Sequence, residues 1–173
     1  MRGVRQLSVL AAAISVGALF AGPAAADEIP SESAIAGYEV GPTITTRETT
    51  MDIPNATGIP APSKCKTQEN TISGKNSLGQ KLWTFHQKVR WCYNGSKVTH
   101  AESSGWATGL ALGWTYKGVQ STETRGGAGQ SAYHVKRTGK FCLVPYVSCA
   151  QEAYPWISHS ATKSGTIGWS RGY

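Results

Sequence analysis

Hydrophobic and polar residues alternate with a period of two in several segments of the chain after residue 81. In the longest of these segments, residues 82–93, one set of alternating positions is largely polar, and the other is almost wholly apolar or aromatic: Trp83, Phe85, Gln87, Val89, Trp91 and Tyr93. This alternation predicts a long β-strand with one face in the core and one face in solvent.

A β-hairpin is predicted directly after this strand. Asn94-Gly95 is typical of a two-residue turn, because both turn residues need positive φ. With such a turn, residues 96–103 return antiparallel, with Trp91 opposite Val98. The same pairing places His100 on the inner face of the hairpin.

The period of two recurs in three further segments. Residues 106–116 alternate before Lys117-Gly118, residues 133–137 alternate before an expected turn at Thr138-Gly139, and residues 156–169 form a final hairpin. Seven or eight short strands without a 3.6-residue period predict an all-β antiparallel β-sandwich, with a small β-barrel as the alternative. The tryptophans in phase with other apolar residues are assigned to the core, and Tyr154, Trp156 and Trp169 are candidates for the surface; the core set is Trp83, Trp91, Trp106 and Trp114.

The first 64 residues divide into two parts. Residues 1–26 have the basic start, the apolar stretch and the Ala24-Ala25-Ala26 cleavage site of a secretory signal peptide, which predicts an extracellular or cell-wall-associated protein without a transmembrane span after cleavage. Residues 27–64 are rich in Pro and Thr, contain six acids and two bases, and predict a flexible acidic arm with one extended patch at residues 35–44. The β-sandwich domain is then residues 65–173.

Four cysteines follow the predicted signal peptide. An exported chain meets an oxidising environment, so two disulfides are expected, and the three possible connectivities stay open. The spacings contain no Cys-x-x-Cys or His-x-x-x-His, so no metal site is predicted. The expected disulfide cysteines are Cys65, Cys92, Cys142 and Cys149.

Catalytic chemistry finds little support in residues 65–173. This segment has no Asp, and its four Glu residues are scattered. Glu102 and Glu123 are a conceivable glycosidase pair, since an acid and a base need only lie about 5 to 10 Å apart. No catalytic residue and no cofactor are predicted, and a small hydrolase is the least favoured class.

Positive charge dominates the predicted domain. Residues 65–173 carry thirteen bases and four acids, and the whole chain has a formal charge of +7. This charge favours a non-catalytic binding module for an anionic cell-wall polymer, an acidic polysaccharide or an anionic lipid surface, acting as a monomer without specific nucleic-acid binding. The alternative is a secreted antimicrobial protein. The expected contacts, including one sugar-stacking candidate, are Lys88, Arg90, Lys97, Lys136, Arg137, Lys140 and Trp156.

Two short motifs carry a resemblance to known proteins. Trp91-Cys92-Tyr93-Asn94-Gly95 and Gly139-Lys140-Phe141-Cys142, followed by Cys149 and Pro155-Trp156-Ile157, resemble a group of small secreted actinobacterial β-rich proteins of unknown function. The resemblance covers roughly residues 80–165. It implies an exported β-domain and carries no catalytic residue across. In size, signal and charge the chain is more loosely similar to bacteriocins of the lactococcin 972 type.

Overall fold

The computed structural model describes residues 34–41, 44–45, 49–54, 60–144 and 148–173. The predicted signal peptide, residues 1–26, lies outside these ranges. Within them, no helix has the length and apolar character needed to cross a membrane. The strands of the described residues are β1 (Gly37–Val40), β2 (Ile44–Thr45), β3 (Thr49–Pro54), β4 (Pro60–Lys75), β5 (Lys81–Tyr93), β6 (Val98–Thr108), β7 (Trp114–Gly126), β8 (Ala132–Leu143), β9 (Gln151–Ala153), β10 (Trp156–Thr162) and β11 (Ile167–Gly172).

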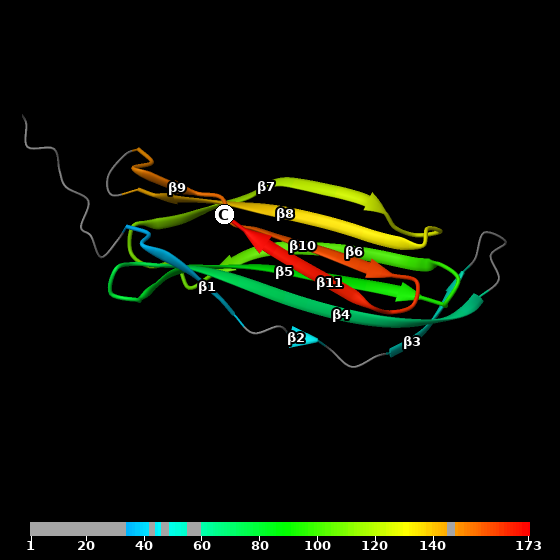
Figure 1. Cartoon of the computed structure of the whole chain (residues 1–173). Coiled ribbons are helices and arrows are strands. Elements are labelled where there is room, and N and C mark those ends of the chain that lie inside the picture. The colour runs from blue at the N-terminus through cyan, green and yellow to red at the C-terminus, as the bar shows by residue number, and fades with distance from the viewer. Residues whose placement is uncertain (1–33, 42–43, 46–48, 55–59, 145–147) are drawn as a thin grey trace, which may run out of the picture.

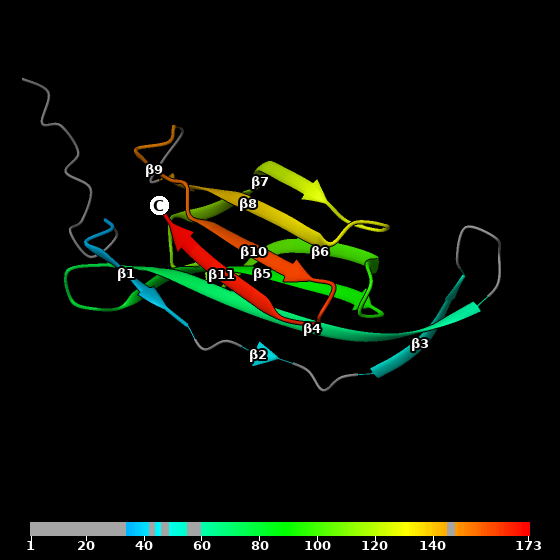
Figure 2. The ribbon, with the colours of Figure 1, turned by 45° about the vertical axis from the view of Figure 1, so that its right-hand side comes forward.

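Two antiparallel sheets pack face to face (Figure 1). The first sheet has the order β1-β4-β5-β6, and β2 and β3 also pair with β4. The second sheet has the order β11-β10-β8-β7, and β9 pairs with β8. The turned view in Figure 2 shows β10 and β11 of the second sheet lying across β4 and β5 of the first. The predicted all-β sandwich is therefore confirmed.

The long β5 strand supplies most of the core from the first sheet. All six of its predicted inward residues, Trp83 to Tyr93, are at most 7% exposed. The Trp83 ring stacks on Phe141 of β8 with a centroid distance of 4.2 Å, and Phe85 meets the same ring edge to face at 6.3 Å. Large aromatic rings that interdigitate between two sheets remove the most apolar area from water per residue.

A polar layer also lies between the sheets. Asn70 on β4 accepts hydrogen bonds from Gln68 Nε2 and from His159 Nε2 on β10, each at 2.8 Å. Gln87 on β5 donates to the Val135 carbonyl of β8 at 3.5 Å. These buried amides and the imidazole link the two sheets by hydrogen bonds instead of apolar contacts.

The predicted register of the β5–β6 hairpin is wrong. Trp91 lies opposite Ala101, not Val98, and His100 is exposed on the outer face. The connection has four residues, and the Asn94 side chain accepts hydrogen bonds from the backbone N–H groups of Ser96 and Lys97. The side chain of Asn94 therefore favours a longer turn than the Asn-Gly pair predicts.

The expected strand over residues 106–116 is also wrong, because a turn at residues 109–113 separates β6 from β7. Gly109 and Gly113 have φ values of +61° and +82°, which end the extended backbone. Leu110 and Leu112 on this turn are 45% and 97% exposed. Trp106 is not in the core but lies on the outer face of β6, stacked on His86.

No turn forms at Thr138-Gly139, since β8 runs unbroken from Ala132 to Leu143. A Cβ on Gly139 would come within 2.8 Å of the Phe85 ring. Glycine is therefore needed here for the close approach of an aromatic ring from the opposite sheet, not for a turn.

Both predicted disulfides are present. The first disulfide joins Cys65 of β4 to Cys92 of β5, which are register partners with a Cα–Cα distance of 4.0 Å. The second disulfide joins Cys142 of β8 to Cys149 in the connection to β9. The connectivity therefore links neighbours within each sheet, and the two sheets are held together by packing and hydrogen bonds without a disulfide between them.

Part of the segment assigned to the acidic arm pairs with the domain. Strands β1, β2 and β3 lie antiparallel to β4, and β4 itself begins at Pro60, so the expected boundary at residue 65 falls inside this strand. Glu39 on β1 forms ion pairs with Lys75 at 3.0 Å and Lys81 at 3.6 Å. These pairs hold the pKa of Glu39 below its usual value, chiefly through the hydrogen bond from Lys75.

Candidate functional site: the aromatic–lysine face

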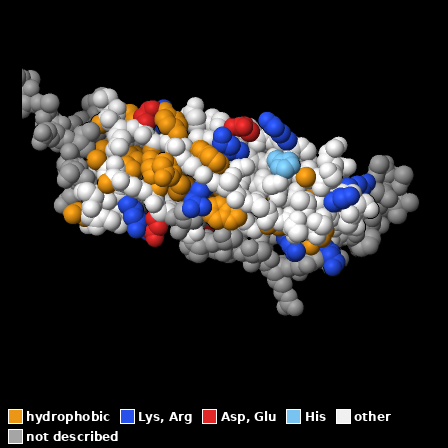
Figure 3. Space-filling model, in the orientation of Figure 1, with side chains coloured by type: hydrophobic (Ala, Val, Ile, Leu, Met, Phe, Trp, Pro, Cys, Tyr) orange, Lys and Arg blue, Asp and Glu red, His pale blue; other side chains and the backbone are white. Residues whose placement is uncertain are grey.

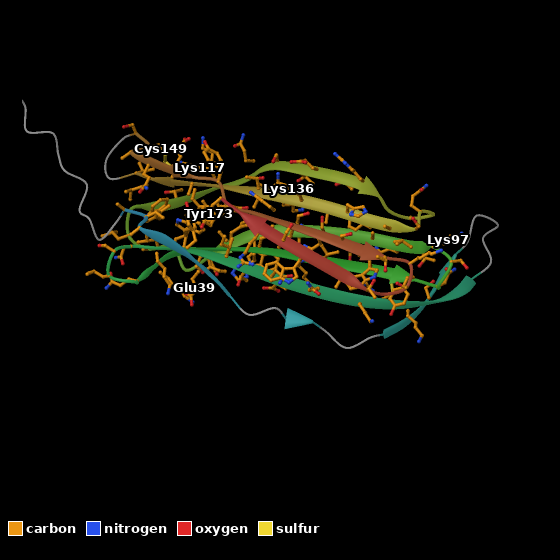
Figure 4. The ribbon with its side chains drawn as sticks, viewed as in Figure 1. Glu39, Lys97, Lys117, Lys136, Cys149 and Tyr173 are labelled. Carbon is orange, nitrogen blue, oxygen red and sulfur yellow. A yellow bond between two sulfur atoms is a disulfide. The ribbon has the colours of Figure 1, made fainter. Side chains whose placement is uncertain are left out.

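The predicted contact residues do not form one patch. Lys88 and Arg90 lie on the outer face of the first sheet, whereas Lys136, Lys140 and Trp156 lie on the outer face of the second sheet. In Figure 4, Lys97 is at the opposite end of the molecule from Lys117 and Cys149, and Lys136 is between them. The remaining residue, Arg137, points between the sheets.

Arg137 acts within the sandwich. Its Nε donates to Ser103 Oγ of β6 at 3.1 Å, its second terminal nitrogen donates to the Ser103 carbonyl at 2.9 Å, and its first donates to Thr122 at 3.2 Å. The alternation of β8 explains this placement, because residue 137 faces inward when residue 136 faces outward. Arg137 therefore joins β8 to β6 across the sandwich.

Four side chains of the second sheet form what we call the aromatic–lysine face: Lys136, Lys140, Tyr154 and Trp156. Lys136 Nζ lies 4.8 Å from the centroid of the Trp156 ring, and Lys140 Nζ lies 5.5 Å from that of Tyr154. Thr138, the register partner of Trp156, separates the two lysines on β8. The strand alternation thus presents two lysine–aromatic pairs in sequence along one face.

The Trp156 indole lies flat on the neighbouring strand. Trp156 is the register partner of Gly172 on β11, and a Cβ on Gly172 would come within 2.6 Å of the indole. The absence of a side chain at residue 172 lets the ring rest on the sheet backbone. The ring is only half-buried there.

Each lysine of this face also has a carboxylate partner. Lys136 Nζ is 3.3 Å from Glu123 of β7, and Lys140 Nζ is 2.8 Å from Glu152 of β9, which also accepts a hydrogen bond from the Tyr154 hydroxyl. The hydrogen bond between Lys140 and Glu152 raises the pKa of Lys140 and lowers the pKa of Glu152. Lys140 therefore stays charged over the whole neutral range.

Two hollows flank the lysine–aromatic pairs. One, of about 300 Å³, lies against Arg125, His134, Lys136, Glu123 and Ser158. The other, of about 400 Å³, is lined by Lys117, Lys140, Glu152, Val144 and the two cysteines of the second disulfide. Together they present four bases and two acids. Figure 3 shows basic, acidic and histidine side chains over β7 and β8, and hydrophobic side chains gathered on the half of the view that holds the C-terminus.

The outer face of the first sheet differs in charge. Lys88 and Arg90 line a hollow of about 270 Å³ together with Glu102, and Arg90 pairs with Glu102 at 3.4 Å. Glu69 is the register partner of Lys88. The two bases are therefore balanced by two acids, whereas the hollows beside the aromatic–lysine face carry four bases and two acids, so the first sheet attracts polyanions less.

The remaining sequence hypotheses concern chemistry. Glu102 and Glu123 lie on the outer faces of different sheets, so they cannot act on one glycosidic bond. Among the described residues, no group of three or more His, Cys, Asp and Glu side chains is placed to hold a metal ion. Of the three aromatic surface candidates, Trp156 and Tyr154 lie on the aromatic–lysine face, and Trp169 packs partly against the core and beneath Arg171.

One arrangement was missed by the sequence analysis. His86 lies between Glu69 and Thr108 on the outer face of the first sheet and forms a hydrogen bond with each. The three residues come from three strands, and Glu69 and Thr108 are 17 and 22 residues from His86 in the sequence. The one sequence signal for this arrangement was the alternation of β5, which places His86 on the outer face.

Comparison with protein-family models, with curated proteins and with solved structures finds no match to this chain. Function therefore has to be inferred from the geometry of the molecule itself.

Proposed function

We propose that this protein is a secreted binding module that holds an acidic polysaccharide on its aromatic–lysine face, with no catalytic step at that face. The observation that carries the proposal is the pairing of two aromatic rings with two lysine ammonium groups on one exposed sheet face. An aromatic ring offers an apolar platform for the C–H face of a sugar, and an ammonium group binds a sugar carboxylate. Two disulfides are compatible with an extracellular site of action.

The ion pairs on this face leave the lysines able to bind a ligand. The side chains of Lys136 and Lys140 are 35% and 29% exposed, and those of Glu123 and Glu152 are 59% and 39% exposed. Ion pairs at such positions contribute at most about 1 kcal/mol, because solvent and salt screen them. A ligand carboxylate can therefore join or replace the glutamate on each lysine.

The test is binding of the full mature chain to polygalacturonate and to neutral dextran, at low and high salt. We expect binding to polygalacturonate alone and its loss at high salt. Replacing both Lys136 and Lys140 with Ala should weaken binding about tenfold, equivalent to about 1.4 kcal/mol for two exposed ion pairs. A matched variant with Lys88 and Lys163 changed to Ala removes the same charge from other surfaces.

Equal weakening by the two double variants would contradict a specific face and leave only general charge attraction. Binding to anionic liposomes in place of the polysaccharide would identify a lipid surface as the partner and overturn the sugar-stacking role of Trp156.

A further inference from the structure

A chain of hydrogen bonds crosses the outer face of the first sheet, on the side opposite to the aromatic–lysine face. His86 Nδ1 is 2.9 Å from Glu69 Oε1 on β4, and His86 Nε2 is 2.6 Å from Thr108 Oγ1 on β6. The strand register produces this line, because Thr71 and Trp106 flank His86 directly, and Glu69 and Thr108 are its diagonal neighbours.

The direction of the hydrogen bonds follows from the chemistry of the partners. An ionised carboxylate only accepts, so Nδ1 carries the hydrogen that is donated to Glu69. Nε2 of the neutral imidazole is then an acceptor, and the Thr108 hydroxyl donates to it. A hydroxyl held by a basic nitrogen, whose ring is oriented by a carboxylate, is the arrangement that activates an oxygen nucleophile.

The imidazole is held in place, and the hydroxyl is open. The Trp106 indole lies nearly parallel to the His86 ring, with an angle of 11° and a centroid distance of 5.0 Å. The side chains of His86 and Glu69 are only 16% and 21% exposed, whereas Thr108 is exposed. At Gly109, which follows Thr108 with φ of +61°, an added Cβ would meet nothing within 4 Å, so a ligand has room beside the hydroxyl.

We infer that Glu69, His86 and Thr108 form a second functional site, which hydrolyses short-chain acyl esters of polar alcohols. Thr108 Oγ1 attacks the ester carbonyl carbon and its proton passes to His86 Nε2. The bond to the alcohol oxygen then breaks, and the alcohol leaves with that proton. Water, deprotonated by His86, attacks the acyl-threonine and releases the carboxylic acid and the free hydroxyl.

Only an extended alcohol, such as a sugar chain, can reach a second place on this face. The hollow lined by Lys88, Arg90 and Ser104 lies two rows along the sheet from Thr108, on the far side of His86 and Trp106, since Lys88 and Ser104 are register partners. Its charged and hydroxyl groups suit a distant polar part of such an alcohol. Thr108 is exposed on the sheet surface, where a short acyl chain can reach it.

The experiment uses p-nitrophenyl acetate with the full mature protein. We expect release of p-nitrophenol and transient acetylation of Thr108, located by peptide mass spectrometry. Thr108→Val should abolish both, and Thr108→Ser should restore them. His86→Gln should slow acylation by at least about 100-fold, the usual contribution of a general base. Thr84→Val, at the register partner of Thr108, is the matched control and should act like the native protein.

Glu69 is a positioning residue, and its test is the split between kcat and KM for p-nitrophenyl acetate. Glu69→Gln keeps an oxygen that can accept from His86 Nδ1 but removes the charge that stabilises the imidazolium formed during acylation, so kcat should fall while KM stays unchanged. Release that persists unchanged in Thr108→Val, or acetylation confined to lysines, would overturn the proposal. If the native protein is acetylated at Thr108 but does not bind polysaccharide, the proposed function is refuted and the hydrolytic site is still supported, because the two sites lie on different sheets.

Discussion

The buried His159 makes the stability of the sandwich sensitive to mild acid. Its side chain is 1% exposed between the sheets, and its Nδ1 has no hydrogen-bond partner among the described residues. Burial lowers the pKa of His159 from 6.5 to about 4, because the charged imidazolium loses its hydration there. The polar groups nearest to it, on Asn70 and Gln68, carry no compensating negative charge.

The sign and size of the effect follow from this lowered pKa. The unfolded chain binds a proton at His159 below pH 6.5, and the folded chain resists it until about pH 4. Stability is therefore fully present above pH 6.5 and falls as the pH drops through the window between the two values. The loss relative to pH 8 should be about 2 kcal/mol at pH 5 and about 3 kcal/mol at pH 4.

Urea unfolding followed by tryptophan fluorescence, at several pH values from 8 to 4, measures this loss. In His159→Gln, whose amide can still donate to Asn70, the stability should change little between pH 7 and pH 5. The control His134→Gln removes an exposed histidine and should keep the native slope. Parallel slopes in the native protein and His159→Gln would refute the assignment. Glu39 and Glu152 have lowered pKa values, so their contributions to stability are lost as the pH falls through 4.5, and the comparison with His159→Gln is therefore made between pH 7 and pH 5.

Two further predictions concern the disulfides and the Trp156 platform. Replacing Cys65 and Cys92 with Ser should lower the free energy of unfolding by about 3.5 kcal/mol. Replacing Cys142 and Cys149 with Ser should lower it by about 2.4 kcal/mol, because the second disulfide closes a shorter loop. Urea unfolding measures both losses, and a larger loss for the second disulfide would contradict the loop-entropy explanation. Gly172→Ala should displace the Trp156 indole, change the near-ultraviolet circular dichroism and weaken polysaccharide binding; an unchanged spectrum would show that the ring does not rest on residue 172.

The sequence predicted the fold class and the inner face of β5, because an alternation sustained over a dozen residues leaves one choice of buried face. It did not predict the hairpin register, because the Asn94 side chain and an irregularity at Cys92/Tyr93 lengthen the connection. That shift in register puts Trp106 on the outer face. A periodicity rule that counts aromatic residues as buried has no means of detecting such a shift.

The buried polar layer between the two sheets could not be predicted from the sequence for a related reason. Gln68, Asn70 and His159 are polar, so a hydrophobicity pattern assigns them to solvent or to an ordinary histidine position. Their burial becomes visible only when β4 and β10 face each other across the sandwich. Likewise, the lack of Asp in residues 65–173 counted against catalytic chemistry, although Glu69 and Thr108 supply a carboxylate and a hydroxyl to His86.

The two outer faces of the sandwich divide the surface chemistry between them. The second sheet presents lysines beside aromatic rings, with an excess of positive charge, which suits retention on an acidic polymer. On the first sheet the charges balance, and a hydroxyl is held on a basic nitrogen, which suits reaction with an ester. Because no side chain belongs to both faces, Lys136→Ala and Thr108→Val should each impair one property alone. A protein with both properties would remain on an acylated acidic polysaccharide while it removes the acyl groups.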